Sequence, residues 1–284
     1  YSENFKNEKI LNFEKKSDQL FSLIKNHDLS NLLMLSLKKN KLVNFTKKNF
    51  NYEKLKHKYK LIFNCDSTNP IFKKYFYKKI DKDYKSFAYT TIIHHKNISN
   101  NTALQVFTKN GPIAFLPISK SKTSVVYSSR EKYDIDLSKY ISKFNKRYEI
   151  IKIEKSSKFK LKSTNLRIYY HKNILAFGDL LHKLHPLAGQ GFNMTLRDIS
   201  IILTLIKSKI NLGLDLDSSI FSDFEKITKH KNYIFSSGID FVYEFFNLES
   251  KTKFKFLSQS VKVLGKNNLI NKFFTKFADQ GIVS

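Results

Sequence analysis

One short segment, residues 178–198, restricts the backbone of this chain more than any other part of the sequence. The chain has only eight glycines and four prolines in 284 residues, yet three of the glycines and one of the prolines lie here. Glycine is favoured where the backbone needs a positive φ or where a ligand approaches the main chain closely. Residues 173–177 are apolar and predict a buried strand, whereas residues 193–206 have apolar residues at helical spacing. The segment therefore predicts a strand, a glycine-rich loop and a helix N-terminus, whose free N–H groups favour an electron-rich ligand.

Ten residues of this segment match the pattern G-D-A-A-H-x-x-H-P-x-x-G-Q-G-x-N-x-G-x-x-D, namely Gly178, Asp179, His182, His185, Pro186, Gly189, Gln190, Gly191, Asn193 and Asp198. On these residues, the segment resembles the second flavin-binding motif of the FAD-dependent aromatic hydroxylases, which have the p-hydroxybenzoate hydroxylase fold. The ubiquinone-biosynthesis hydroxylases are the most similar branch of that family. Thr195 stands in place of the last glycine of the pattern, so we expect a small shift of the helix.

Other segments resemble the same family in the same order. Residues 61–67 look like the strand that ends in the G-A-D-G motif; Asp66 is kept, while Asn64 and Ser67 replace the flanking glycines. Residues 107–117 resemble the F-x-x-x-G-P-x-A-x-L-P segment of the substrate-binding sheet. The end of the chain, residues 263–282, is similar to the closing helix of the family.

The strand-GxGxxG-helix unit that opens this family and holds the ADP half of FAD has no counterpart in the sequence. The chain begins at Tyr1, and residues 18–29 look like the region downstream of that unit. Our interpretation is an amino-terminally incomplete sequence. A genuinely reduced paralogue that does not hold FAD by itself is the alternative, and the sequence leaves both open.

The order of elements predicts a mixed α/β fold, in which an α/β domain is interrupted by an inserted antiparallel β-sheet domain and followed by a helical C-terminal tail. The resemblance implies that the interrupted domain binds FAD. Residues 1–86 are expected to form the remainder of the first FAD-binding part, and residues 87–155 the substrate-binding sheet. Residues 156–210 are expected to form the second FAD-binding part, and residues 211–284 the helical region.

Local patterns predict the individual elements of these parts. An amphipathic helix is expected within residues 17–39, with an apolar set of Leu20, Ile24, Leu29, Leu32, Leu33 and Leu37. Runs rich in β-branched and aromatic residues predict strands over 43–50, 60–65, 87–94, 103–108, 113–118 and 124–129. A short helix is expected over 138–145.

The resemblance implies roles for particular residues. Asp179 would accept a hydrogen bond from the ribityl chain of FAD, although a turn or helix-cap aspartate is the alternative. Asp66 would support the pyrophosphate, and Pro186 would pack beside the reactive face of the flavin with His185 nearby. The other expected cofactor contacts are Gly178, Gly189, Gln190, Gly191, Phe192 and Asn193. The expected substrate contacts, taken to form one apolar face, are Phe107, Gly111, Pro112, Phe115 and Leu116.

Three residues invite other interpretations. His182 and His185 have an H-x-x-H spacing, but a zinc site needs a third ligand, so we expect no metal and assign the pair to shaping the loop. No catalytic residue is named by the resemblance beyond the flavin-proximal Pro186 and His185. A single cysteine, Cys65, excludes an intrachain disulfide and is expected to be a small buried thiol.

The formal net charge of +27 suggests an anionic partner. Lysine dominates over arginine and is scattered along the chain, whereas nucleic-acid recognition favours the arginine fork, so we expect no nucleic-acid partner. No run of eighteen apolar residues occurs, and we expect a cytoplasmic location. Residues 254–277 combine apolar and basic residues, which suits either contact with the inner face of a membrane or packing on the domain.

The function that the resemblance implies is FAD-dependent monooxygenation of the aromatic ring of a polyprenylated phenol in ubiquinone biosynthesis. NADH or NADPH would be the reductant, O2 the second substrate, and other ubiquinone-biosynthesis proteins candidate partners. The alternative is a truncated non-catalytic paralogue that acts as a partner or scaffold. A basic nucleic-acid-binding protein is the third and least supported hypothesis.

Overall fold

The computed structural model describes residues 1, 21–46, 52–130, 135–185 and 190–252. These residues form two compact units, which are described separately. Unit 1 centres on residues 87–159 and unit 2 on residues 50–86 together with 160–249.

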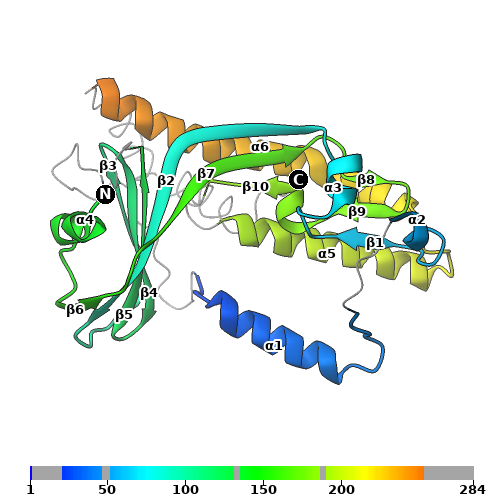
Figure 1. Ribbon diagram of the computed structural model, residues 1–284, viewed down its shortest axis with the longest axis horizontal. Coiled ribbons are helices and arrows are strands. Elements are labelled where there is room, and N and C mark those ends of the chain that lie inside the picture. The colour runs from blue at the N-terminus through cyan, green and yellow to red at the C-terminus, as the bar shows by residue number, and fades with distance from the viewer. Residues whose placement is uncertain (2–20, 47–51, 131–134, 186–189, 253–284) are drawn as a thin grey trace. The chain divides into compact units, whose positions relative to one another are not determined.

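Unit 1 is an antiparallel sheet with one helix packed on it (Figure 1). Its elements are α1 (Asn26–Lys39), β2 (Lys79–His95), β3 (Leu104–Thr108), β4 (Gly111–Ser119), β5 (Lys122–Ser129), α4 (Leu137–Phe144) and β6 (Ile150–Ile153). The strands pair in the order β2, β5, β4 and β3, and β6 pairs with the end of β2. The first half of β2, up to Ser86, belongs to unit 2, and the strand continues into unit 1.

The core of unit 1 lies between α4 and one face of this sheet. Burial alternates along β4, and both Ile113 and Phe115 are completely buried, as expected for a strand with one core face. Helix α4 contributes the apolar side chains of Leu137, Ile141 and Phe144, which recur at helical spacing and join the same cluster.

Unit 2 combines a short parallel pair of strands with two long helices (Figure 1). Its elements are α2 (Tyr52–Leu55), β1 (Ile62–Asn64), α3 (Pro70–Tyr75), β7 (Ser157–Leu166), β8 (Tyr170–His171), β9 (Ile174–Ala176), the 3-10 helix η2 (Gly178–Leu180), β10 (His182–Lys183), α5 (Gln190–Asn211) and α6 (Ser219–Thr252). The strands form the series β1, β9, β8 and the series β10, β7, β2. All three residues of β9 are completely buried, in a core that also contains Ile202 of α5 and Phe221 and Phe224 of α6.

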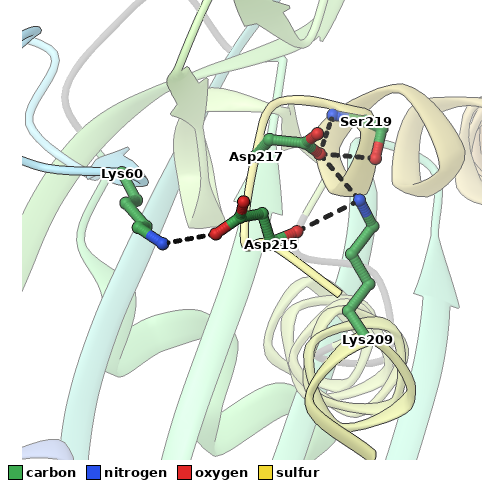
Figure 2. Close-up of polar contacts among 5 residues, drawn as sticks. All are labelled: Lys60, Lys209, Asp215, Asp217 and Ser219. Atoms are coloured by element: carbon green, nitrogen blue, oxygen red, sulfur yellow. Dashed lines mark hydrogen bonds and ion pairs between the residues drawn. The ribbon is translucent and has the colours of Figure 1, made fainter. Parts of the chain in front are cut away.

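Hydrogen bonds and ion pairs hold the connection from α5 to α6 (Figure 2). The Oδ1 of Asp217 accepts from the backbone N–H of Ser219 at 3.0 Å and from its hydroxyl at 2.6 Å, so Asp217 caps the start of α6. Lys209 Nζ lies 2.7 Å from the same oxygen and 3.3 Å from the carbonyl of Asp215. Lys60 Nζ lies 2.7 Å from the Asp215 carboxylate. The hydrogen bond from Lys209, followed by those from Ser219, lowers the pKa of Asp217 to about 2.

The mixed α/β fold class is confirmed, and most predicted elements are present with shifted ends. The predicted strand over 43–50 is wrong for residues 43–46, which form no strand; the rest lies outside the described residues. Within the predicted helical region over 211–284, α6 covers Ser219–Thr252, and residues 214–217 connect it to α5. Residues 253–284, including the predicted closing helix, lie outside the described residues. Within the described ranges, no helix is long and apolar enough to cross a membrane.

The helix predicted within residues 17–39 is present as α1, which begins at Asn26. Leu29 is half-buried, whereas Leu32 is 64% exposed. Residues 32–35 are four consecutive apolar residues, so their side chains surround the helix and do not form a single stripe.

The prediction that Cys65 is a buried thiol is wrong. Asn64 at the end of β1 is buried, and successive side chains of an extended chain point to opposite sides, so the next residue, Cys65, is exposed.

The titration of Asp217 tests the α5–α6 connection. Its pKa in the folded chain is about 2, below the ordinary value of 3.8. Because the folded pKa is lowered, the stability that this carboxylate contributes is present above the ordinary pKa and is lost as the pH falls toward 2. We expect carbon-13 NMR to give a midpoint near 2 in the parent chain and a higher midpoint in Lys209→Met. Lys226→Met, which removes a lysine paired with Asp223, is the matched control and should leave the midpoint unchanged. A parent midpoint near the ordinary value contradicts the described contacts.

Candidate functional site

The parallel pairing of β1 with β9 brings two distant segments to one edge of unit 2. Asn64 is in register with Ala176, and the backbone N–H of Phe177 donates to the carbonyl of Asn64 at 2.9 Å. Because the two strands run in the same direction, the loops that carry Asp66 and Asp179 start at the same edge. In open α/β sheets, ligands bind beyond the carboxyl ends of the strands. We call this edge, from residues 64–68 and 178–181, the carboxyl edge.

The Gly178-Asp179 turn presents a free carboxylate at the carboxyl edge. Gly178 has a φ of +66°, a conformation that favours glycine, and Leu180 and Leu181 are buried behind it. Asp179 is exposed, and no group in the part of the chain that the structure describes is hydrogen-bonded to its carboxylate. The turn therefore exposes a hydrogen-bond acceptor to solvent, while the two leucines that follow it are buried.

Asp66 and Asn64 line the other half of the carboxyl edge. The Oδ1 of Asp66 accepts from the backbone N–H of Thr68 at 2.8 Å and from its hydroxyl at 2.7 Å, and the hydroxyl bond is the main reason that the pKa of Asp66 is lowered. Its carboxylate thus closes its own turn. Asn64, which the sequence analysis treated only as a replaced glycine, is buried, and its Nδ2 has no hydrogen-bond partner among the described residues. The edge therefore offers both an unpaired donor and an unpaired acceptor.

The first turn of α5 carries four of the predicted cofactor residues, from Gln190 to Asn193. Helix η2 contacts α5, and both helices belong to unit 2. The first four N–H groups of a helix have no partner within it, and the first turn contains no acidic residue. No described atom lies within 4 Å of a Cβ built on Gly191. Pro186 and Gly189 lie outside the described residues, and their predicted contacts stay predictions.

His182 is paired with the last residue of the motif, Asp198 of α5. The Nε2 of His182 lies 2.6 Å from the Oδ2 of Asp198, and the two residues are 1% and 2% exposed. Asn232 of α6 donates to the other oxygen of Asp198 at 3.3 Å. Burial raises the pKa of the Tyr169 hydroxyl. Sequence reasoning found His182 and Asp198 from the motif, whereas no pattern marks Asn232 or Tyr169.

His185 is buried between two tyrosine rings. Its ring lies 4.8 Å from that of Tyr84 on β2 and 4.2 Å from that of Tyr243 on α6, centroid to centroid. The Tyr84 hydroxyl is hydrogen-bonded to Asp240 of α6, and burial raises its pKa. The residue that directly precedes Pro186 is therefore held by two separate elements of unit 2.

The predicted substrate residues lie on β3 and β4 in unit 1, and the sheet divides them between two faces. Phe115 points into the core under α4 and is completely buried, while Gly111 is a buried residue at the start of β4. Phe107 pairs with Pro112 across the strands, and these two share the opposite, half-buried face with Leu116. The expectation of one apolar face is wrong, because successive residues of a strand alternate sides.

Gly111 is required by the packing of the sheet itself. A Cβ at this position would lie 2.0 Å from the carbonyl oxygen of Ser128, and the φ of Gly111 is +138°. The close approach of β4 to β5 therefore accounts for this glycine without any ligand.

Comparison with known proteins confirms the resemblance to flavin-dependent hydroxylases. The chain is similar to the ubiquinone hydroxylase UbiL of Rhodospirillum rubrum, with 23% identity over 58% of this chain and 41% of that protein. It is also similar to the 3-demethoxyubiquinol 3-hydroxylase of Escherichia coli, with 27% identity over 54% of this chain and 41% of that protein. Human ubiquinone biosynthesis monooxygenase COQ6 is 25% identical over 50% of this chain and 40% of that protein. The chain thus spans about two fifths of the length of these curated relatives. No family model matches the chain.

Solved structures with the same fold support the architecture. The p-nitrophenol 4-monooxygenase PnpA of Pseudomonas putida aligns with a TM-score of 0.61 and 9% identity over 78% of this chain and 59% of that one. Klebsiella pneumoniae HpxO, solved with FAD and uric acid, aligns with a TM-score of 0.58 and 8% identity over 77% of this chain and 60% of that one. The described residues therefore have the fold of FAD-dependent aromatic monooxygenases.

Gly111→Ala tests the packing of β4 on β5. The added Cβ would meet the backbone of Ser128, which cannot turn aside as a side chain can. We expect urea unfolding to show a loss of about 2–4 kcal/mol from the clash and the strained φ. Ala114→Ser, on the half-buried face of the same strand, is the matched control and should cost less than about 1 kcal/mol. Equal stabilities of the two variants would show that Gly111 is not needed for packing.

Proposed function

We propose that this chain forms the part of an FAD-dependent monooxygenase that holds the ribityl chain and ring of FAD, and that the enzyme hydroxylates the aromatic ring of a polyprenylated phenol in ubiquinone biosynthesis. The observation that carries the proposal is the free Asp179 carboxylate, presented by a positive-φ glycine at the carboxyl edge. Three curated relatives named for ubiquinone hydroxylation support the choice of substrate class.

The residues at the carboxyl edge suit a ligand that is rich in hydroxyl groups and carries negative charge. Asp179 would accept a hydrogen bond from the ribityl chain, while the buried Nδ2 of Asn64 lies at the same edge of the sheet. The N–H groups of Gln190–Asn193 and the positive end of the α5 dipole would favour negative charge at the pyrimidine edge of the flavin ring. Asp66 would shape its loop so that backbone groups support the pyrophosphate. When bound, FAD supplies the redox chemistry, with NADH or NADPH as the reductant and O2 as the oxygen source.

The substrate side of the proposal rests on unit 1. Phe107, Pro112 and Leu116 share a half-buried apolar face of the sheet, which is suited to contact with an aromatic ring and the start of a prenyl tail. The contribution of these residues would be to orient the ring and to exclude water. Gly111 and Phe115 would act only through the sheet that they support.

Asp179→Ala tests the cofactor half of the proposal. Loss of one hydrogen bond to a charged acceptor should cost about 1.5–3 kcal/mol, which is about ten- to a hundredfold in FAD affinity. We expect flavin fluorescence titration of the purified chain to give this weakening, with an unchanged circular dichroism spectrum. In the host cell, the same substitution in the gene should lower ubiquinone and accumulate a polyprenylated phenol that lacks one ring hydroxyl.

Asp223→Ala is the matched control, since it removes the same charge from an exposed position on α6. It should leave both FAD affinity and ubiquinone unchanged. Equal FAD affinities of the parent and Asp179→Ala would remove Asp179 from the site. Normal ubiquinone together with weakened FAD binding in Asp179→Ala would show that the chain belongs to a flavoprotein that acts on another substrate.

A further inference from the structure

One buried pair joins the two elements on either side of residues 186–189. His182 belongs to β10, and Asp198 lies in α5, eight residues after Gln190. Their atoms Nε2 and Oδ2 are 2.6 Å apart, and neither side chain is more than 2% exposed. Any displacement of α5 relative to β10 would therefore stretch a hydrogen bond that is shielded from water.

Asp198 is held from a second side. Asn232 of α6 donates to its Oδ1 at 3.3 Å. Both carboxylate oxygens thus have partners, from β10 and from α6. The orientation of α5 about its own axis is fixed by this arrangement, because Asp198 can satisfy both partners in only one rotation of the helix.

Stability alone gives little reason for this pair. Desolvation of two polar groups opposes their attraction, and apolar replacement of a complete buried pair is often neutral for stability. A pair of this kind can instead select one geometry among several of similar energy. The geometry selected here concerns α5, which contacts η2 and carries Gln190–Asn193 in its first turn.

We propose that His182 and Asp198 are positioning residues, which fix the rotation of α5 relative to β10 and so aim the N–H groups of Gln190–Asn193. The inference rests on the proposed function in one respect, namely that the position of these N–H groups affects the binding of FAD. The position of the helix itself does not depend on that function and can be measured without cofactor.

The test compares three variants of the chain. The double variant His182→Leu/Asp198→Leu removes the pair without leaving a buried charge alone. His182→Gln keeps an N–H donor at the position of Nε2 and is the conservative variant. The matched control is His94→Leu/Glu154→Leu, which removes another histidine–carboxylate pair with a separation of 2.6 Å, in unit 1.

Hydrogen exchange gives the readout that is independent of cofactor. The amides of Met194–Arg197 bond the carbonyls of the first turn of α5, so they report whether that turn is in place. We expect their exchange to be about tenfold faster in the double variant, about as slow as in the parent in His182→Gln, and unchanged in the control. Amides at residues 224–236 of α6 should exchange at the parent rate in every variant, which would show that unit 2 remains folded.

FAD titration of the same proteins gives the second readout. We expect the double variant to bind FAD about tenfold or more weakly and His182→Gln to stay within about threefold of the parent. Unchanged exchange at Met194–Arg197 in the double variant would overturn the positioning role, whatever happens to FAD. Faster exchange with unchanged FAD affinity would also overturn it. Faster exchange in a chain whose parent binds no FAD would support the positioning of α5 while the proposed function fails.

Discussion

The parallel pairing of β1 with β9 is the contact on which the rest of unit 2 depends. Each strand has three residues, so their few hydrogen bonds cannot hold the pair alone. The pairing is secured by packing, since Ile174, Leu175 and Ala176 are completely buried under Phe221 and Phe224 of α6. Because β1 and β9 come from segments more than a hundred residues apart, this one contact creates the carboxyl edge.

Near the glycine-rich segment, the chain buries polar side chains, although burial of apolar side chains would avoid the cost of desolvation. His182, His185 and Asp198 are at most 2% exposed, and each is held by partners from another element. Burial of polar groups is costly unless they are paired, so their concentration beside the glycine-rich segment indicates a requirement for defined geometry. The exposed Asp179 is the opposite case, a carboxylate with no hydrogen-bond partner among the described residues. A preorganised binding site needs groups that contact the ligand and surrounding residues that hold those groups in place.

The sequence was informative where the determinants are local. The glycine-rich segment predicted a strand, a turn and a helix because glycine placement and apolar spacing act within a few residues, and the alternating strands of unit 1 were found in the same way. Contacts between distant segments could not be predicted: no pattern connects Asp198 with Asn232, or His185 with Tyr84 and Tyr243. The substrate set was assigned to one face because its members were taken together from a motif, whereas the pleat of β4 separates Leu116 from Phe115.

The most direct measurement for the central claim is a map of backbone amide shifts of the chain as FAD is added. We expect the largest changes at residues 64–68 and 178–183 of the carboxyl edge and at residues 190–194 at the start of α5, which are far apart in sequence. Residues of α4 and β6, which belong to unit 1, should change little. Changes confined to other lysine-rich surfaces, or none at millimolar FAD, would contradict the assignment of this edge as the cofactor site.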